Sequence, residues 1–253
     1  MNKSKTIQTI KFEPQNVLVV GASGGIGSAI VDTFANKQST LNIFASSRKK
    51  NNFKCRKIKS LIIDYFDEAT FTDAVKAISA NVDSLDLILI TTGFLHNYPD
   101  YIPEKSWKSI NSTDMIKSYH INCVGPALVA RYMLPLLSKE KKTVFAALSA
   151  RVGSISDNKL GGWYSYRCSK AALNMVIRNL SIELSRLYPK AICVGLHPGT
   201  VDTRLSSPFL NSVPRGKLFS PQKVAVQLVD LISDLEHESS GKIHAWNGSL
   251  IEY

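Results

Sequence analysis

The sequence predicts a single α/β domain built on a doubly wound parallel sheet of about seven strands. Three observations support this fold class. The 253 residues match the size of one large domain. Short β-rich runs alternate with longer amphipathic stretches, as they do in βαβ units. Neither an internal repeat nor a linker rich in Pro, Gly or Ser divides the chain. We therefore expect one domain over residues 1–253, with an N-terminal extension over residues 1–14.

Seven apolar runs rich in β-branched and aromatic residues are expected to form the strands. They are Asn16–Val20, Leu41–Ala45, Ile58–Ile63, Leu85–Thr91, Thr143–Ser149, Ala191–His197 and Lys242–Trp246. The longer stretches between them are expected to form helices over Gly25–Lys37, Asp67–Ala80, Thr113–Lys139, Trp163–Leu187 and Pro221–Leu235. Residues 206–219 contain two prolines and a glycine, which predicts a loop that contacts substrate.

Composition limits the class of protein. Hydrophobic residues make up 44% and charged residues 20% of the chain, which excludes disordered, collagen-like and coiled-coil proteins. The spacing of Cys55, Cys123, Cys168 and Cys193 matches neither a zinc site nor a disulfide framework. The apolar run 17–20 is too short for a signal peptide or a membrane span. We expect a cytoplasmic protein without a membrane partner.

The net charge of +11 would suit nucleic acid, an anionic membrane or a phosphorylated ligand. Much of the excess lies between Arg48 and Lys59, where Phe53 is the aromatic residue available to stack on a base. Nucleic-acid binding is therefore the last-ranked hypothesis, and we expect no nucleic-acid partner.

A glycine-rich turn follows the first expected strand. The segment Gly21-Ala-Ser-Gly-Gly-Ile-Gly27 connects that strand to the first expected helix. Glycines let the backbone turn tightly and approach a pyrophosphate, while the helix N-terminus offers free N–H groups. Gly21, Gly25 and Gly27 therefore predict a dinucleotide site on a Rossmann-type sheet. The alternative is a βα turn that binds no ligand.

The end of the second expected strand indicates which dinucleotide binds. The strand runs into Ala45-Ser-Ser-Arg48, without the acid that accepts hydrogen bonds from an adenosine ribose. A guanidinium can instead bind a 2′-phosphate through a planar pair of N–H groups, and Ser23 and Ser47 could donate beside it. Arg48 therefore favours NADP(H). The alternative is that Arg48 belongs to a solvated basic surface.

Tyr166 and Lys170 are the candidate proton-transfer pair. On a helix, residues four apart share a face, so Tyr166 meets Lys170 while Tyr164 points elsewhere. A nearby ammonium favours the phenolate and makes the phenol a better acid. The alternative is a chance pair on an exposed helix face. The five histidines lack metal-ligand spacing, so we expect no metal.

These motifs resemble the classical short-chain dehydrogenase/reductase family. The resemblance spans almost the whole chain, from the glycine turn through Ile121-Asn122 and Tyr166-x-x-x-Lys170 to Pro198-Gly199-Thr-Val-Asp-Thr203. Within the family, the sequence is most similar to C-factor-type members, in residues 149–175, 197–203 and 240–249.

The resemblance implies a role for each matching position. Asn122 would hold a water in a proton relay with Lys170, and Lys170 would hydrogen-bond the nicotinamide ribose. Asp64 would contact the adenine and Thr203 the carboxamide. Further cofactor contacts are implied for Ile26, Gly93, Pro198, Gly199 and Val201. Taken alone, Asn122, Asp64 and Thr203 could equally be capping or turn residues.

Two departures from the family pattern bear on activity. The usual N-N-A-G after the fourth strand reads Ile90-Thr-Thr-Gly93, so an amide that braces the strand is missing. The usual Ser-Ser-x-x-Gly reads Ser149-Ala150-Arg-Val-Gly153, which places Ala150 where the substrate-orienting serine is expected. Ser149 is the first candidate to replace it, and Ser154 is the next.

The sequence therefore predicts an NADP(H)-dependent oxidoreductase that transfers a hydride between nicotinamide and a small carbonyl or alcohol substrate. Tyr166 is the expected general acid/base, and His96, Trp163 and Phe209 are candidates to line the substrate pocket. The resemblance also implies a homodimer or homotetramer that pairs through the two longest helices. The alternative is a C-factor-like signalling protein that binds the cofactor with little turnover.

Overall fold

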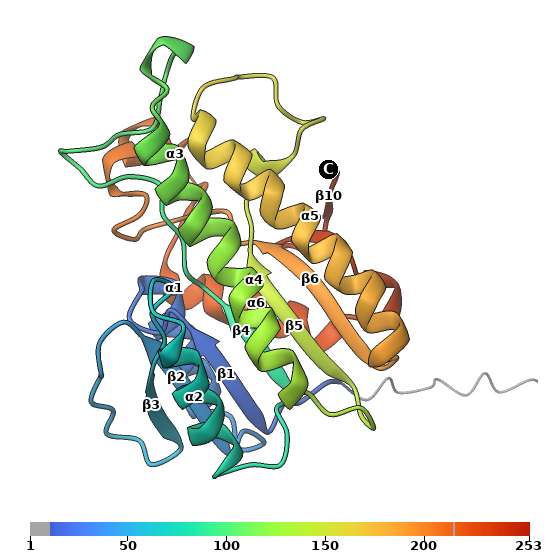
Figure 1. Cartoon of the computed structure of the whole chain (residues 1–253). Coiled ribbons are helices and arrows are strands. Elements are labelled where there is room, and N and C mark those ends of the chain that lie inside the picture. The colour runs from blue at the N-terminus through green and yellow to red at the C-terminus, as the bar shows by residue number, and fades with distance from the viewer. Residues whose placement is uncertain (1–10, 215) are drawn as a thin grey trace, which may run out of the picture.

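The computed structural model describes residues 11–214 and 216–253. The expected N-terminal extension lies mostly outside these residues, and only its last four can be described. An eight-stranded sheet forms the centre of the fold (Figure 1). Its strands are β1 (Asn16–Val20), β2 (Asn42–Ser47), β3 (Ile58–Ile62), β4 (Leu87–Ile90), β5 (Thr143–Leu148), β6 (Ala191–His197), β9 (Ile243–Ala245) and β10 (Leu250–Ile251).

The strand order creates the crevice in which ligands of such sheets bind. The order is β10-β9-β6-β5-β4-β1-β2-β3, and all neighbours are parallel except the antiparallel pair β9 and β10. The chain leaves the edge strand β3 and returns to the middle at β4, beside β1. The two halves of the sheet therefore diverge between the carboxyl ends of β1 and β4, which is where ligands of this architecture bind.

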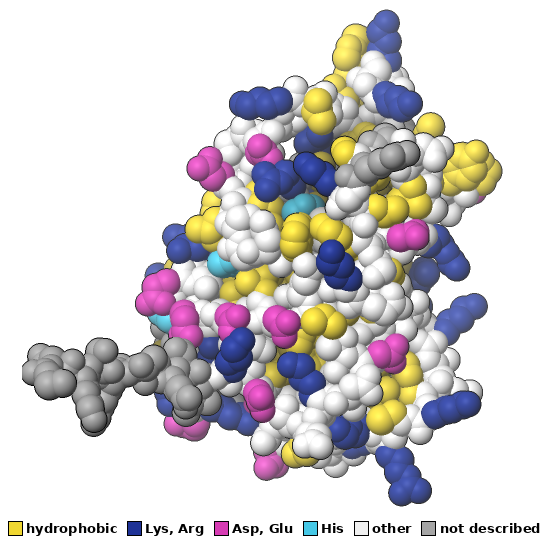
Figure 2. Space-filling model, turned by 180° about the vertical axis from the view of Figure 1, so that it is seen from behind, with side chains coloured by type: hydrophobic (Ala, Val, Ile, Leu, Met, Phe, Trp, Pro, Cys, Tyr) yellow, Lys and Arg dark blue, Asp and Glu magenta, His cyan; other side chains and the backbone are white. Residues whose placement is uncertain are grey.

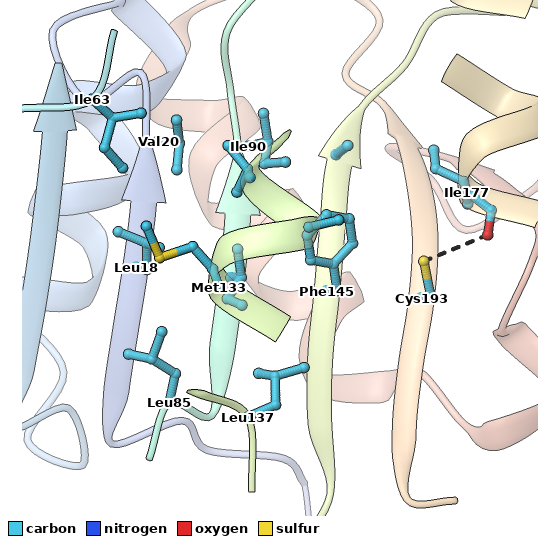
Figure 3. Close-up of a cluster of buried hydrophobic side chains, with 14 of the residues drawn as sticks. Leu18, Val20, Ile63, Leu85, Ile90, Met133, Leu137, Phe145, Ile177 and Cys193 are labelled. Carbon is cyan, nitrogen blue, oxygen red and sulfur yellow. Dashed lines mark hydrogen bonds between the residues drawn. The ribbon is translucent and has the colours of Figure 1, made fainter. Parts of the chain in front are cut away.

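Helices cover both faces of the sheet (Figure 1). The helices are α1 (Gly25–Ala35), α2 (Ala69–Ser79), α3 (Ser112–Tyr119), α4 (Gly125–Met133), α5 (Tyr164–Leu187) and α6 (Pro221–Asp234). One core cluster joins the sheet to α2, α4 and α5, and the other joins it to α1 and α6. In the first cluster, Leu18, Ile90 and Phe145 point from the sheet toward Met133 of α4 (Figure 3).

The expected fold class is confirmed, and the strands lie within a few residues of their expected positions. The prediction of one helix over Thr113–Lys139 is wrong in detail. A π-helical turn, His120–Val124, separates α3 from α4, and a 3₁₀ turn, Leu134–Leu136, ends the segment. Pro126 explains the interruption, because proline has no N–H to donate to the carbonyl four residues earlier.

Two short strand pairs were not expected. The segment 206–219 contains a 3₁₀ turn, Ser207–Ser212, and the strand β8 (Leu218–Phe219), which pairs with β7 (Thr200–Val201). Strand β10 adds an eighth member to the sheet. Strands of two residues are too short to produce the alternation by which a strand is detected in a sequence.

One face of the molecule carries a mixture of positive and negative side chains. On the face that carries α1 and α6, lysine and arginine side chains are interspersed with aspartate and glutamate (Figure 2). None of the described helices combines the length and the apolar character needed to cross a lipid bilayer.

Candidate active site

The glycine turn after β1 is packed so closely that side chains would not fit. Gly21 has φ +92°, which favours glycine, and Gly21 and Ala22 donate backbone hydrogen bonds to Ser46 O. A Cβ on Gly27 would lie 2.3 Å from Gly21 O. The N-cap of α1 is Gly24, which has no side chain to occupy the helix N-terminus. The turn thus leaves an exposed helix N-terminus at the crevice, as a pyrophosphate site requires.

The other expected cofactor residues follow β4 and β6, whose carboxyl ends share one edge of the sheet with this turn, and Thr203 contacts the turn directly. A Cβ on Gly25 would lie 2.9 Å from Thr203 Cγ2, so the Pro198–Thr203 segment closes over the glycine turn. Gly93, which follows β4, lies beside Leu205 and Asn122. Gly199 has φ +75°, and its backbone packs against Phe219 and Trp246. Two further cofactor candidates contact the apolar core. Val201 is a buried member of it, and Ile26 packs against it.

Arg48 and Asp64 follow the ends of neighbouring strands, β2 and β3. Arg48 is exposed. Ser47 is less suited to the role we expected, because its hydroxyl donates to Lys49 O and accepts from Asn51. Ser23 is exposed at the glycine turn. Asp64 Oδ1 accepts a hydrogen bond from Phe66 N at 3.0 Å and so shapes the turn before α2.

Tyr166 and Lys170 lie one turn apart on the buried face of α5. Lys170 Nζ is 5.9 Å from the centre of the Tyr166 ring and donates to Leu148 O, at the end of β5, at 2.8 Å. Burial raises the pKa of Tyr166 to about 12 and lowers the pKa of Lys170 to about 8. Both shifts favour the neutral form, because transfer from water penalises charge. In the protein alone, burial therefore outweighs the activation of the phenol that we expected from Lys170.

Asn122 connects the loop after β4 to α5. Its Oδ1 accepts from Phe94 N at 2.8 Å, and its Nδ2 donates to Phe94 O at 2.7 Å and to Ser169 Oγ at 3.0 Å. The side chain is fully buried inside the π-helical turn. Through these contacts, Asn122 connects Phe94 to Ser169, which directly precedes Lys170. The relay through water implied for Asn122 stays a prediction.

The two serines considered as replacements for Ala150 have other partners. Ser149 Oγ donates to Asn174 Oδ1 at 2.6 Å, which commits its one proton. Ser154 Oγ accepts from Asp157 N and pairs with Ser156 Oγ. Hydrogen bonds thus direct both hydroxyls to groups other than Tyr166. Ala150 itself is half-buried and precedes a 3₁₀ turn, Arg151–Gly153, that packs against Lys170.

Aromatic rings gather beside the Tyr166 phenol. The ring of Trp163 lies 6.3 Å from that of Tyr166 and 5.0 Å from that of Phe209. The ring of His96 lies 5.8 Å from that of Phe209. The three residues that we considered for the substrate pocket are therefore brought together, although they come from three segments that are far apart in the sequence.

Sequence reasoning missed two features of this site. Thr91 Oγ1 donates to Val20 O at 2.9 Å, so a hydroxyl braces β4 against β1 where the family has an amide. Glu104 is 3% exposed and contacts the first residues of α5. No spacing rule links Glu104 to a partner 61 residues away, and only the fold shows the contact.

Most of the chain matches one protein family. Residues 15–212 match the short chain dehydrogenase family, and the chain belongs to it. The expected resemblance to classical short-chain dehydrogenases is confirmed. The chain is accordingly an oxidoreductase of this family.

Individual relatives agree with this assignment. An uncharacterised oxidoreductase of Schizosaccharomyces pombe is 24% identical, over 93% of this chain and 96% of its own. The C-signal protein of Myxococcus xanthus is 34% identical, over 57% of this chain and 81% of its own. The NADPH-bound carbonyl reductase from chicken fatty liver has the same fold, with a TM-score of 0.82 at 22% identity, and the match covers 96% of each chain.

Proposed function

We propose that this protein is an NADP(H)-dependent carbonyl reductase that transfers a hydride between nicotinamide and a small carbonyl or alcohol substrate. The observation that carries the proposal is the position of Tyr166. It lies one turn before Lys170, which is bonded to the end of β5. The carboxyl end of β5 belongs to the edge of the sheet at which ligands of parallel α/β sheets bind.

The fit of a dinucleotide rests on the glycine turn and on Arg48. A Cβ at position 27 would lie 2.3 Å from Gly21 O, so glycine there lets α1 pack closely on the turn and keeps the helix N-terminus beside it. The exposed guanidinium of Arg48 follows β2 and can pair with a 2′-phosphate. That preference agrees with the NADPH of the chicken carbonyl reductase, which has the same fold. Thr203 and Gly93 line the same crevice for the nicotinamide end.

A bound nicotinamide would supply or accept the hydride. Tyr166 would give its phenolic proton to the carbonyl oxygen as the hydride reaches the carbon, and would take that proton back in the reverse direction. A hydrogen bond from Lys170 Nζ to Leu148 O holds the ammonium beside the phenol. The positive charge of this ammonium would stabilise the phenolate left after proton transfer. The substrate would lie with its carbonyl oxygen at the Tyr166 hydroxyl and its apolar part against the rings of Trp163 and Phe209.

The test is a screen of NADPH oxidation at 340 nm over aldehydes, ketones and diketones. A substrate that is reduced by the unmodified protein and not by Tyr166→Phe supports the proposal. Tyr164→Phe is the matched control, because it removes a phenolic hydroxyl two residues before Tyr166. Activity that survives in Tyr166→Phe would contradict the assignment.

One observation favours a second function, a signalling protein that binds the cofactor with little turnover. Ala150 stands where the family has a serine, and part of the chain is 34% identical to C-signal. Calorimetry with NADPH separates the two proposals. Tight binding without turnover of any carbonyl in the screen favours the signalling function, and measurable turnover favours the reductase.

We also propose that the protein forms a homodimer or homotetramer through α5 and the α3–α4 segment. Large apolar side chains are exposed on these helices, at Ile116, Val124, Met175 and Ile182. Burial of such side chains between copies is favourable. Light scattering after gel filtration measures the mass, and a monomer at micromolar concentration would contradict this.

A further inference from the structure

The helix that carries Tyr166 and Lys170 begins in an unusual way. Its N-cap is Trp163, whose indole cannot accept a hydrogen bond from the first helical N–H groups. Trp163 also has φ 52°, a left-handed conformation that is uncommon for a residue with a Cβ. Gly161 and Gly162 precede it with positive φ angles as well. The start of α5 therefore needs support from elsewhere in the fold.

Glu104 supplies that support. Its Oε2 accepts from Ser165 N at 3.2 Å, and its Oε1 accepts from Ser165 Oγ. Its backbone oxygen accepts from Trp163 N. A carboxylate at a helix N-terminus satisfies an orphan N–H group and interacts favourably with the helix dipole. Glu104 thus replaces the side-chain cap that Trp163 cannot provide.

The contact is buried and rigid on both sides. Glu104 is 3% exposed, and Ser165 is fully buried. Tyr101 OH lies 3.5 Å from Glu104 Oε1, and burial raises the pKa of Tyr101 to about 12, so this hydroxyl stays protonated and able to donate. A carboxylate removed from water needs such hydrogen bonds to offset its lost hydration. Its position is therefore determined by Ser165 and Tyr101.

The capped turn determines where the catalytic groups lie. Tyr166 directly follows Ser165, and the Trp163 ring, fixed by the left-handed backbone, packs on Tyr166 and on Phe209. Glu104 belongs to the segment that follows β4, and Asn122 holds that same segment at Phe94. Both anchors tie the loop after β4 to α5, one near Lys170 and the other just before Tyr166.

We infer that Glu104 is a positioning residue for proton transfer. It acts through Ser165 and Trp163, holding the Tyr166 phenol and the Trp163 ring in the geometry that the reaction needs. The effect on turnover rests on the proposed reductase function. The effect on the position of the Trp163 ring is expected whether or not the protein reduces a carbonyl.

The chain offers a matched control for removing a buried carboxylate. Asp86 is also 3% exposed and accepts from two backbone N–H groups, Gln15 N at 2.9 Å and Asn16 N at 2.8 Å. It lies at the amino ends of β1 and β4, opposite the edge of the sheet that holds Tyr166. Asp86 Oδ1 also forms an ion pair with Lys141 Nζ at 2.6 Å. Asp86→Asn therefore removes a buried carboxylate at the opposite end of the sheet and breaks an ion pair as well, which makes it a stringent control for a general loss of stability.

The first measurement is steady-state kinetics with NADPH and the best substrate of the screen. Glu104→Gln should lower kcat by about tenfold or more, because a small displacement of the reacting groups is costly in rate. The dissociation constant for NADPH should stay within about twofold. Asp86→Asn should lower the melting temperature without a comparable loss of kcat. Unchanged kcat in Glu104→Gln, or equal losses in both variants, would overturn the inference.

A double-mutant cycle tests the route of the effect. Ser165→Ala removes the hydroxyl that donates to Glu104 and leaves the carboxylate in place. If the two residues act through one contact, Glu104→Gln should lower kcat much less in the Ser165→Ala protein than in the unmodified protein. Additive losses would show that Glu104 does not act through the Ser165 hydroxyl, which is the contact that the variant removes.

The second measurement does not need turnover. The chain has three tryptophans, so Trp107→Phe with Trp246→Phe leaves the emission of Trp163 alone. In this background, Glu104→Gln should shift the emission to longer wavelength and increase quenching by acrylamide, whereas Asp86→Asn should change neither. Unchanged Trp163 emission would overturn the inference. If the unmodified protein reduces no carbonyl, the proposed function fails, and the emission still decides the role of Glu104.

Discussion

The proposed cofactor side and the proposed substrate side of the crevice are built in different ways. The glycine turn lies within seven consecutive residues, Gly21–Gly27, whose glycines are required by contacts inside the turn and with Thr91 and Thr203. The substrate side is assembled from the loop after β4, the start of α5 and the segment around Phe209. The difference indicates that cofactor binding should tolerate changes on the substrate side, whereas turnover should depend on both.

The strongest test of this division is Tyr166→Phe. Loss of the phenolic proton should lower kcat by about 10²–10⁴-fold, the usual contribution of a general acid. The dissociation constant for NADPH should barely change, because the phosphates are proposed to bind at the glycine turn and not at Tyr166. Fluorescence titration with NADPH and initial rates measure the two quantities. A large loss in Tyr164→Phe instead would identify the other tyrosine as the acid.

The next effect concerns the cofactor side alone. Arg48→Glu should weaken NADPH binding by about one to two powers of ten and leave NADH binding nearly unchanged, because one charge-assisted contact to the 2′-phosphate is lost. Arg56→Glu is the control for the general loss of positive charge in the same basic segment. Equal affinities for NADPH and NADH in the unmodified protein would contradict the role of Arg48.

The pH dependence should report Lys170. Burial lowers its pKa to about 8, so the ammonium is present below that pH and is lost above it. The rate of carbonyl reduction should therefore fall by up to about tenfold per pH unit above about 8. Lys170→Met should lack this dependence and bind NADPH less tightly. A rate that stays constant to pH 10 would contradict the requirement for the ammonium.

The titration of Lys170 does not itself destabilise the fold over this range. The pKa of Lys170 is lower in the folded protein than its usual value of 10.5, so the unfolded chain binds more protons between these values. This group therefore raises the free energy of unfolding as the pH increases from about 8 to 10.5. Tyr166 acts in the opposite sense only from about pH 10 to 12. Melting temperatures recorded over the same pH range provide the check.

The smallest effects are expected at the serine position. Ser149→Ala should lower stability by about 1 kcal/mol through its bond to Asn174 and change kcat by less than about threefold. Ser154→Ala should change kcat equally little. Ala150→Ser should raise kcat a few-fold if the added hydroxyl reaches the substrate. A large loss of kcat in either alanine variant would show that its hydroxyl turns toward the carbonyl during the reaction.

The sequence predicted the sheet, the glycine turn and the Tyr166–Lys170 pair because each depends on neighbouring residues. Alternation of apolar residues indicates a strand, and a spacing of four on a helix places two side chains on one face. The left-handed conformation of Trp163 could not be predicted, since it depends on Glu104 from a distant loop. The direction of Ser149 likewise depends on Asn174, which α5 brings to it.

The missing amide after β4 shows the limit of reasoning from family patterns. The amide that braces the strand is absent, yet Thr91 donates to Val20 O and Thr92 pairs with Tyr65 OH at 2.8 Å. A hydroxyl can replace an amide in this position, because both groups donate a hydrogen bond to a backbone carbonyl. The substitution changes the chemistry of the contact and keeps the connection between β1 and β4.

That threonine has a consequence for protein engineering. A Cβ on Gly21 would lie 2.9 Å from Thr91 Oγ1, and one on Gly27 would lie 2.6 Å from the same atom. The Thr91 hydroxyl therefore fills the space beside two glycines of the turn. Consensus design, which replaces unusual residues by the commonest ones of a family, would introduce asparagine at position 91. Its longer side chain would have to take another direction beside the same two glycines, so the packing of Gly21 and Gly27 is the place to inspect in such a variant.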